Sequence, residues 1–287
     1  MRILYITNHI QTAQSSGGFV NDYLNDLLFH GLTELKNIEV IDSTPIIHLY
    51  KENKKQIPIQ SLWGKGFTST YLIDKDNVDR TNIEEKIKDK YFDLIIYGSI
   101  NRCLDYYNIV SEIYPPNKIF LIDGDDSTNT HTLSKVHPYF KRESISNEFI
   151  PIHFAIPECK ITNNKLDKIQ EYGSIIPGKD GYKFDIEQEY YNDYNKSYYG
   201  VTKKKAGWDC MRHYEILANN CIPYFIDLTE CPHQTLTNLP KELLLEGREL
   251  ASNFEVGKYF NILNELFEFT KNNLTTKQLA QYLLNHV

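Results

Sequence analysis

The amino-acid sequence predicts an α/β protein made of two doubly wound halves that face each other across a cleft. Short apolar runs of strand length alternate with segments of helical periodicity, which is typical of parallel sheets with helices on both faces. This alternation stops at the proline-containing stretch 143–165 and then begins again. The 287 residues are enough for two cores of ordinary size.

In the first half, four apolar runs are expected to be strands, at residues 3–8, 38–43, 92–100 and 117–126. Helices are expected between them, at about 20–35, 83–91 and 103–114. The first helix is indicated by apolar residues from Tyr23 to Leu32 that recur at the spacing of one helical face. The third is expected to end at Pro115, because proline cannot continue a helix.

The second half is expected to repeat this pattern. Its strands are predicted at residues 171–178, 198–203 and 221–227. Its helices are predicted at 186–197 and 207–220, in a short segment within 235–244, and as one or two amphipathic helices over 256–287. We therefore expect two domains, residues 1–155 and residues 156–287.

Composition excludes several classes of protein. The formal charge of −7 disfavours nucleic-acid binding, although short basic runs occur at 51–55 and 203–205. No apolar run reaches the ~20 residues that a membrane-spanning helix needs, so no transmembrane segment is expected. The N-terminal residues lack the features of a signal peptide, so we expect a cytoplasmic protein. Five cysteines, an odd number without a C-x-x-C pair, predict neither a disulfide framework nor a metal site.

Ligands of open α/β sheets bind beyond the carboxyl ends of the strands, which directs attention to the loops that follow each strand. The first such loop contains His9 and the pair Gly17-Gly18, which opens a helix. The glycines would let backbone N–H groups approach a phosphate or an acceptor, and His9 is a candidate base. The loop lacks the G-x-G-x-x-G pattern of dinucleotide sites, and a plain turn is the alternative.

An acidic motif, Asp123 to Ser127, follows the strand at 117–126. Three carboxylates within four residues are costly to place together unless they are solvated, hydrogen-bonded or paired with cations. Asp126 and Asp123 are therefore candidate general bases, while a metal site and a capped turn are the alternatives. Lys141 and Arg142, shortly downstream, are expected to face these carboxylates or a diphosphate.

The most informative segment lies at residues 202–225. Gly207 precedes a predicted helix on which Arg212 and Glu215 share one face. A glycine near a helix start lets the backbone approach an anion, and the positive end of the helix favours negative charge. Lys203, Lys204 or Lys205, together with Arg212, would supply cations for a diphosphate, and Glu215 suits the two hydroxyls of a ribose. An ordinary amphipathic helix with a surface Arg–Glu pair is the alternative.

The stretch KKAGWDCMRHYEILANNCIPYFIDLTECPHQTLTNLPKELL resembles the C-terminal donor-binding segment of exostosin-like and related GT-B glycosyltransferases. In that family a helix carrying Arg and Glu precedes a small-residue turn, an IPYF-type strand and a Cys-Pro loop. Here the pattern is Glu215, Ala218 and Pro223, with Asn220-Cys221 where glycine is usual. The motifs LIDGDDS, YFKRE and NDYLNDLLFHGL are also similar to the N-terminal half of this group.

The resemblance implies a GT-B-like fold, in which two Rossmann-like domains face each other across a cleft. It implies that the C-terminal domain holds a nucleoside-diphosphate sugar, with Glu215 on the ribose and Arg212 on the diphosphate, and that the N-terminal domain holds the acceptor. We expect sugar transfer without a tightly bound metal or a further cofactor. The acceptor (glycan, protein, lipid or modified nucleobase) and the stereochemistry stay open. The alternative is a non-catalytic sugar- or nucleotide-binding protein of the same fold.

Overall fold

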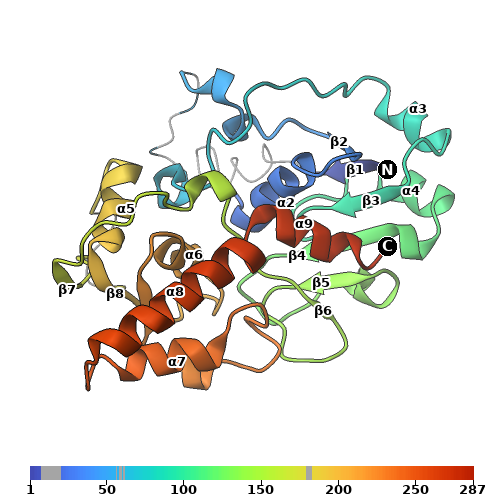
Figure 1. The fold of residues 1–287 in the computed structure, drawn as a ribbon. Coiled ribbons are helices and arrows are strands. Elements are labelled where there is room, and N and C mark those ends of the chain that lie inside the picture. The colour runs from blue at the N-terminus through green and yellow to red at the C-terminus, as the bar shows by residue number, and fades with distance from the viewer. Residues whose placement is uncertain (8–20, 56, 58–59, 61, 179–182) are drawn as a thin grey trace.

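The computed structural model describes residues 1–7, 21–55, 57, 60, 62–178 and 183–287. These residues form a Rossmann-like α/β protein with two parallel sheets, one of six strands and one of three (Figure 1). None of the helices in these ranges is both long and apolar enough to cross a bilayer.

The larger sheet has the strand order β2-β1-β3-β4-β5-β6, and all neighbouring strands are parallel. The strands are β1 (Arg2–Ile6), β2 (Glu39–Asp42), β3 (Leu94–Tyr97), β4 (Ile119–Asp123), β5 (Tyr139–Lys141) and β6 (Ile150–Pro151). The central strands β3 and β4 are buried along their whole length. They are apolar at nearly every position because both faces of the sheet are covered.

Alternate residues of each central strand enter different cores. Ile3 and Tyr5 of β1 pack with α2 (Tyr23–Thr33) and α9 (Thr276–Leu284) on one face of the sheet. Leu4 and Ile6 pack on the other face with α3 (Ile83–Lys88) and α4 (Tyr107–Ile113). Because successive side chains of a strand point to opposite faces of the sheet, each central strand packs against both layers of helices.

The smaller sheet has the order β7-β8-β9 and is also parallel. Its strands are β7 (Gln170–Tyr172), β8 (Ser197–Thr202) and β9 (Ile222–Phe225). Its helices are α5 (Glu187–Asn195), α6 (Met211–Ala218), α7 (Lys241–Glu249) and α8 (Val256–Asn273). Short 3-10 helices occupy Ile47–Leu49, Lys51–Asn53, Trp63–Gly66, Pro116–Lys118, Thr132–Lys135, Glu158–Lys160 and Leu228–Glu230.

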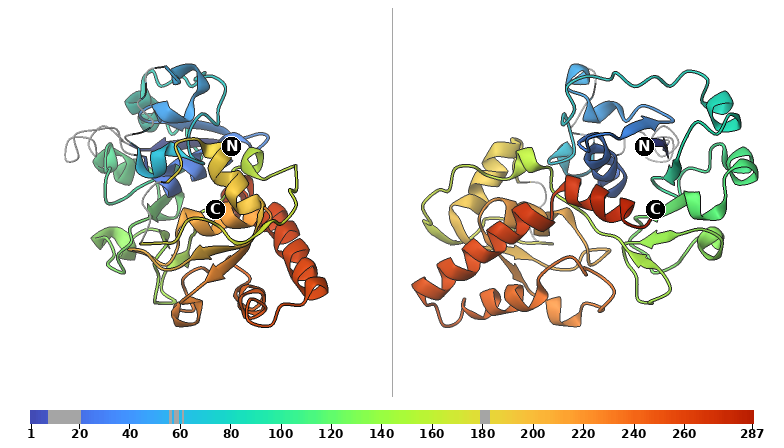
Figure 2. Two further views of the ribbon diagram at one scale, coloured as in Figure 1. Left: turned by 90° about the vertical axis from the view of Figure 1, so that its left-hand side faces the viewer. Right: turned by 45° about the vertical axis from the view of Figure 1, so that its right-hand side comes forward.

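The C-terminal helices connect the two sheets. Figures 1 and 2 show α8 running along the smaller sheet and α9 lying beside α2 on the larger one. At the corner between α8 and α9, the Ile156 N–H donates to the Leu274 carbonyl over 2.9 Å, and the Thr276 N–H donates to the Ile156 carbonyl over 3.0 Å. The predicted boundary near residue 155 stays a prediction, and α9 packs with the first half although it lies in the second half of the sequence.

The helices and strands expected from periodicity are present, most of them with narrower bounds, whereas α7 extends to Glu249, beyond the predicted segment 235–244. Two strands, β5 and β6, were not expected. They contain three and two residues, which is too short for a period to be recognised. The segment between β2 and α3 also had no predicted element, and its 3-10 turns are held by tertiary contacts.

The contact between α2 and α9 can be tested at Gly31. A Cβ atom added there would lie 2.0 Å from the Thr276 carbonyl oxygen, so the two helices would have to separate. We expect Gly31→Ala to lower the free energy of unfolding by roughly 1–3 kcal/mol, measured by urea denaturation.

The matched control is Gly257→Ala in α8, where an added Cβ meets nothing within 4 Å. It should leave stability unchanged or raise it by up to ~1 kcal/mol, because alanine favours the helix. Equal stability of the two variants would contradict the close approach of α2 and α9.

Candidate functional site

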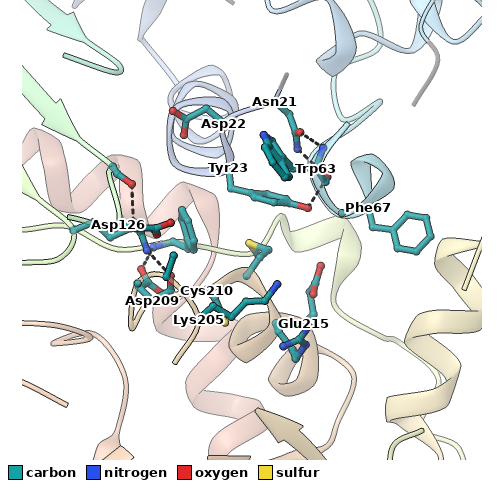
Figure 3. A pocket seen from close by; sticks show the side chains of 18 of the residues that line it. Asn21, Asp22, Tyr23, Trp63, Phe67, Asp126, Lys205, Asp209, Cys210 and Glu215 are labelled. Carbon is teal, nitrogen blue, oxygen red and sulfur yellow. Dashed lines mark hydrogen bonds and ion pairs between the residues drawn. The ribbon is translucent and has the colours of Figure 1, made fainter. Parts of the chain in front are cut away.

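A cavity of about 750 Å³ lies among the segments that follow β4, β5 and β8 (Figure 3). Residues 124–126 come from the loop after β4, Arg142 directly follows β5, and residues 205–212 lead from β8 into α6. The start of α2 and the loop between β2 and α3 complete the walls. The cavity is therefore at the carboxyl ends of strands from both sheets, where ligands of α/β proteins bind.

One wall of the cavity carries cations that form no ion pair at contact distance with the described residues. Arg212, in the first turn of α6, lines the cavity, and its Nε and Nη1 atoms are buried without a hydrogen-bond partner in that part of the chain. The side chains of Lys205 and Lys183 line the same space, and both residues are exposed. A buried guanidinium with unpaired donors costs free energy, and an anion that accepts hydrogen bonds from those donors would remove this cost.

Glu215 also lines the cavity, one turn after Arg212. Its Oε1 accepts a hydrogen bond from Thr68 Oγ1 at 2.5 Å, and its Oε2 accepts one from the Tyr190 hydroxyl at 2.5 Å. Burial raises the pKa of this carboxyl, and the two hydrogen bonds oppose that rise. Each oxygen retains one further lone pair for a ligand.

Thr68 belongs to a segment that we name the cleft loop, residues 62–71, between β2 and α3. Although it lies in the first half of the sequence, it contacts α5 and the turn before it: the Thr68 N–H donates to Glu187 Oε1 at 2.5 Å, and Lys65 Nζ lies 2.6 Å from Asp185 Oδ1. Thr68 itself has a φ of 70°, a strained value for a β-branched residue. These contacts hold the loop across the cavity.

Asp123 lies beneath the cavity, fully buried, and does not line it. Its carboxylate is 2.9 Å from Lys141 Nζ, accepts a hydrogen bond from Asn101 Nδ2 at 3.1 Å, and accepts another from the Tyr139 hydroxyl. The expectation that Lys141 faces the acidic motif is confirmed. Because the Asp123 carboxylate is fully buried and already engaged by Lys141, Asn101 and Tyr139, this geometry argues against Asp123 as a general base.

Asp126, in contrast, lines the cavity and its side chain is 53% exposed. It forms an ion pair with Arg142, as expected for the residues after β5. Arg142 is itself buried and donates further hydrogen bonds to the carbonyls of Gly124 and Asp209. Asp126 is thus the acidic candidate that a substrate can reach.

Glu143 joins the two sheets beside this pair. Its carboxylate accepts hydrogen bonds from the N–H groups of Trp208 at 2.9 Å and Asp209 at 3.0 Å, and it lies 3.0 Å from Arg142. We name Arg142 and Glu143, with the backbone of Trp208 and Asp209 that they bind, the clasp. The clasp fixes the segment that leads into α6.

Gly207 precedes α6, but it lies further from the start of the helix than expected. The N-cap of α6 is Cys210, three residues later. A Cβ atom on Gly207 would lie 2.5 Å from Glu143 Oε1 and 2.7 Å from Asp126 Oδ1. Glycine therefore lets the carboxylates of Glu143 and Asp126 lie close to the backbone, and the residue lines the cavity.

The structure brings together five of the predicted residues around the cavity: Asp126, Lys205, Gly207, Arg212 and Glu215. Lys203 does not line it. His9, Gly17 and Gly18 lie outside the described residues.

Sequence reasoning missed several lining residues, namely Asp22, Trp63, Phe67, Arg102 and Asp209. The glycine-flanked WGKG run, with one of only two tryptophans in the chain, was a usable signal for the cleft loop. Asp209 lies within the predicted segment 202–225, and its Oδ2 accepts a 2.7 Å hydrogen bond from the Phe154 N–H.

In the part of the chain that the structure describes, no three His, Cys, Asp or Glu residues are grouped so that they could hold a metal ion. All five cysteines are free thiols. Comparisons of this chain with protein-family models, curated proteins and solved structures return no match.

The buried Asp209 predicts a pH dependence of stability. Burial raises its pKa from 3.8 to about 6, against the opposing effect of Arg142. The folded protein therefore retains a proton that the unfolded chain has lost, and the stability contributed by neutral Asp209 is present below pH 4 and lost as the pH rises through 6. We expect Asp209→Asn to gain ~3 kcal/mol relative to the wild type between pH 4 and pH 7.

Urea denaturation of both proteins at several pH values measures this difference. Asp167→Asn, at an exposed carboxylate, controls for the loss of one negative charge. A constant difference between Asp209→Asn and the wild type over this range would contradict the prediction.

Proposed function

We propose that this chain is a glycosyltransferase of the GT-B type, which transfers a sugar from a nucleoside-diphosphate sugar to an acceptor. The observation that supports this most strongly is Arg212, which lines the cavity and whose buried Nε and Nη1 atoms lack a partner among the described residues. A diphosphate would supply the missing charge and acceptors. A cavity of about 750 Å³ is in the usual size range of small-molecule sites.

The chemistry would depend on electrostatic stabilisation of the leaving group. As the bond between sugar and diphosphate oxygen breaks, negative charge grows on the diphosphate. Arg212, Lys205 and the start of α6, whose N-cap Cys210 makes no side-chain capping hydrogen bond, would stabilise that charge without a tightly bound metal. Retention of activity in EDTA is the corresponding expectation.

Two carboxylates would have different tasks. Glu215 would accept hydrogen bonds from the ribose hydroxyls through its remaining lone pairs, while Thr68 and Tyr190 hold it in position. If the sugar is inverted, a base must remove the proton of the acceptor hydroxyl, and Asp126 is the exposed candidate. If the configuration is retained, the protein need not supply a base.

A non-catalytic nucleotide-sugar-binding protein is the second candidate. The observation that favours it is the ion pair between Asp126 and Arg142, because this pair occupies the most exposed carboxylate among the candidate bases. Slow hydrolysis of a nucleoside-diphosphate sugar in the absence of an acceptor would support the enzyme. Tight binding without any turnover, across a panel of sugars, would support the binding protein.

The anion site is tested with UDP, GDP, ADP and CMP by thermal shift and calorimetry. A nucleotide at 100 times its dissociation constant should stabilise the protein by ~2.7 kcal/mol. For the nucleotide that binds best, we expect Arg212→Gln to weaken affinity by about 10- to 100-fold, because a charge-assisted hydrogen bond contributes ~1.5–3 kcal/mol.

Lys205→Ala should weaken the same affinity by about fivefold, a loss of ~1 kcal/mol. The matched control is Lys204→Ala. Lys204 neighbours Lys205, but its ammonium lies over the Trp208 ring, 5.3 Å from the centroid, and it does not line the cavity. The control should leave affinity unchanged. Undiminished binding by both Arg212→Gln and Lys205→Ala would refute the proposed anion site.

A further inference from the structure

Trp63, at the edge of the cavity, is unusually exposed for its size. It lines the cavity, yet 61% of the residue is accessible to solvent. Exposing a large aromatic surface is unfavourable, and such surfaces commonly mark binding sites. No described residue accepts a hydrogen bond from the indole N–H.

The backbone of Trp63 is nevertheless held firmly. Its N–H donates to Asn21 Oδ1 at 2.7 Å, and its carbonyl accepts hydrogen bonds from the Tyr23 hydroxyl at 3.1 Å and Asn21 Nδ2 at 3.3 Å. A Cβ on the next residue, Gly64, would lie 2.2 Å from the Tyr23 hydroxyl oxygen. The exposed ring is therefore presented from a fixed main chain, which reduces the entropy lost when a ligand packs on it.

The wall that carries Trp63 differs in charge from the wall that carries Arg212. In Figure 3, Asp22, Tyr23 and Trp63 lie on the side of the cavity opposite Lys205 and Glu215. Asp22 is paired with Arg102 at 2.7 Å, and Asp125 and Asp126 line the cavity from the loop after β4. Arg102 neutralises Asp22, so among the described residues this wall offers a phosphate no unpaired cation, while its carboxylate oxygens accept hydrogen bonds from hydroxyl groups.

We propose that Trp63 is the stacking platform for a sugar ring of the acceptor, and that the acceptor is an uncharged carbohydrate. The inference rests on the proposed function, in which the diphosphate occupies the opposite wall. A pyranose has one face of C–H bonds, which suits the electron-rich face of an indole, and an edge of hydroxyls, which suits carboxylates and the indole N–H. A nucleotide on this wall would place its phosphates beside Arg102, which is already paired with Asp22.

Fluorescence tests the platform directly, because the chain has only two tryptophans. Trp208→Phe leaves Trp63 as the single indole, and Trp208 does not line the cavity. Methyl pyranosides of glucose, galactose, mannose and N-acetylglucosamine are titrated into this protein with and without UDP. At least one should change the emission saturably, while Trp63→Phe, which retains only Trp208, should not respond.

Two substitutions of Trp63 distinguish the contribution of an aromatic ring to binding from that of an apolar side chain. Trp63→Leu removes the aromatic face and keeps an apolar side chain, whereas Trp63→Phe keeps a smaller aromatic face. For the pyranoside that binds best, measured by calorimetry, we expect Trp63→Leu to weaken affinity about tenfold and Trp63→Phe about threefold. The affinity for UDP should change less than about twofold in both variants.

Two results would overturn the inference: unchanged Trp63 emission with every pyranoside while UDP binds, or a loss of UDP affinity in Trp63→Leu as large as the loss for the pyranoside. The second result would assign Trp63 to the nucleobase. If the wild type binds no nucleotide but Trp63 responds to a pyranoside, the proposed glycosyltransferase fails while the carbohydrate platform is retained.

Discussion

The clasp formed by Arg142 and Glu143 is the interaction on which the geometry of the site depends. Both side chains are almost fully buried between the sheets. A buried ion pair recovers its desolvation cost only if its remaining donors and acceptors are used, and here they bind the Gly124 and Asp209 carbonyls and the Trp208 and Asp209 N–H groups. The clasp therefore connects the end of β5 to the segment that begins α6, and so determines where Arg212 stands relative to the larger sheet.

The contrast between two arginines in one cavity is informative. Arg142 and Arg212 both line it, and both are largely withdrawn from water. Arg142 pairs with Asp126 and Glu143, whereas Arg212 leaves Nε and Nη1 unused by any described residue. These ion pairs within the protein explain why Arg142 is buried and give it a structural role. The same explanation is missing for Arg212, so an external anion is the simplest physical reason for its position.

The sequence predicted the parts of the molecule that depend on local periodicity. The main strands and helices follow from apolar spacing, and Arg212 and Glu215 were placed together because one helix sets their separation. Trp63 and Thr68 could not be placed, because the cleft loop has no period and is fixed by contacts distant in sequence: Thr68 and Glu215 are 147 positions apart. Asp123 and Asp126 looked alike in sequence. In the structure, Lys141 and Tyr139 engage the buried Asp123, which gives it a structural role, whereas Asp126 stays accessible.

The cleft loop connects the two walls of the cavity and is fixed at both. Asn21 and Tyr23, at the start of α2, hold it on one side, while Glu187 of α5 and Glu215 of α6 hold it on the other. These hydrogen bonds offset the strain of its left-handed residues, among which Thr68 is β-branched. A loop anchored in this way presents its aromatic side chains before a ligand arrives, so binding need not order the main chain. The fixed loop also sets the distance between the wall that carries Trp63 and the wall that carries Arg212. A ligand must therefore fit both walls at once.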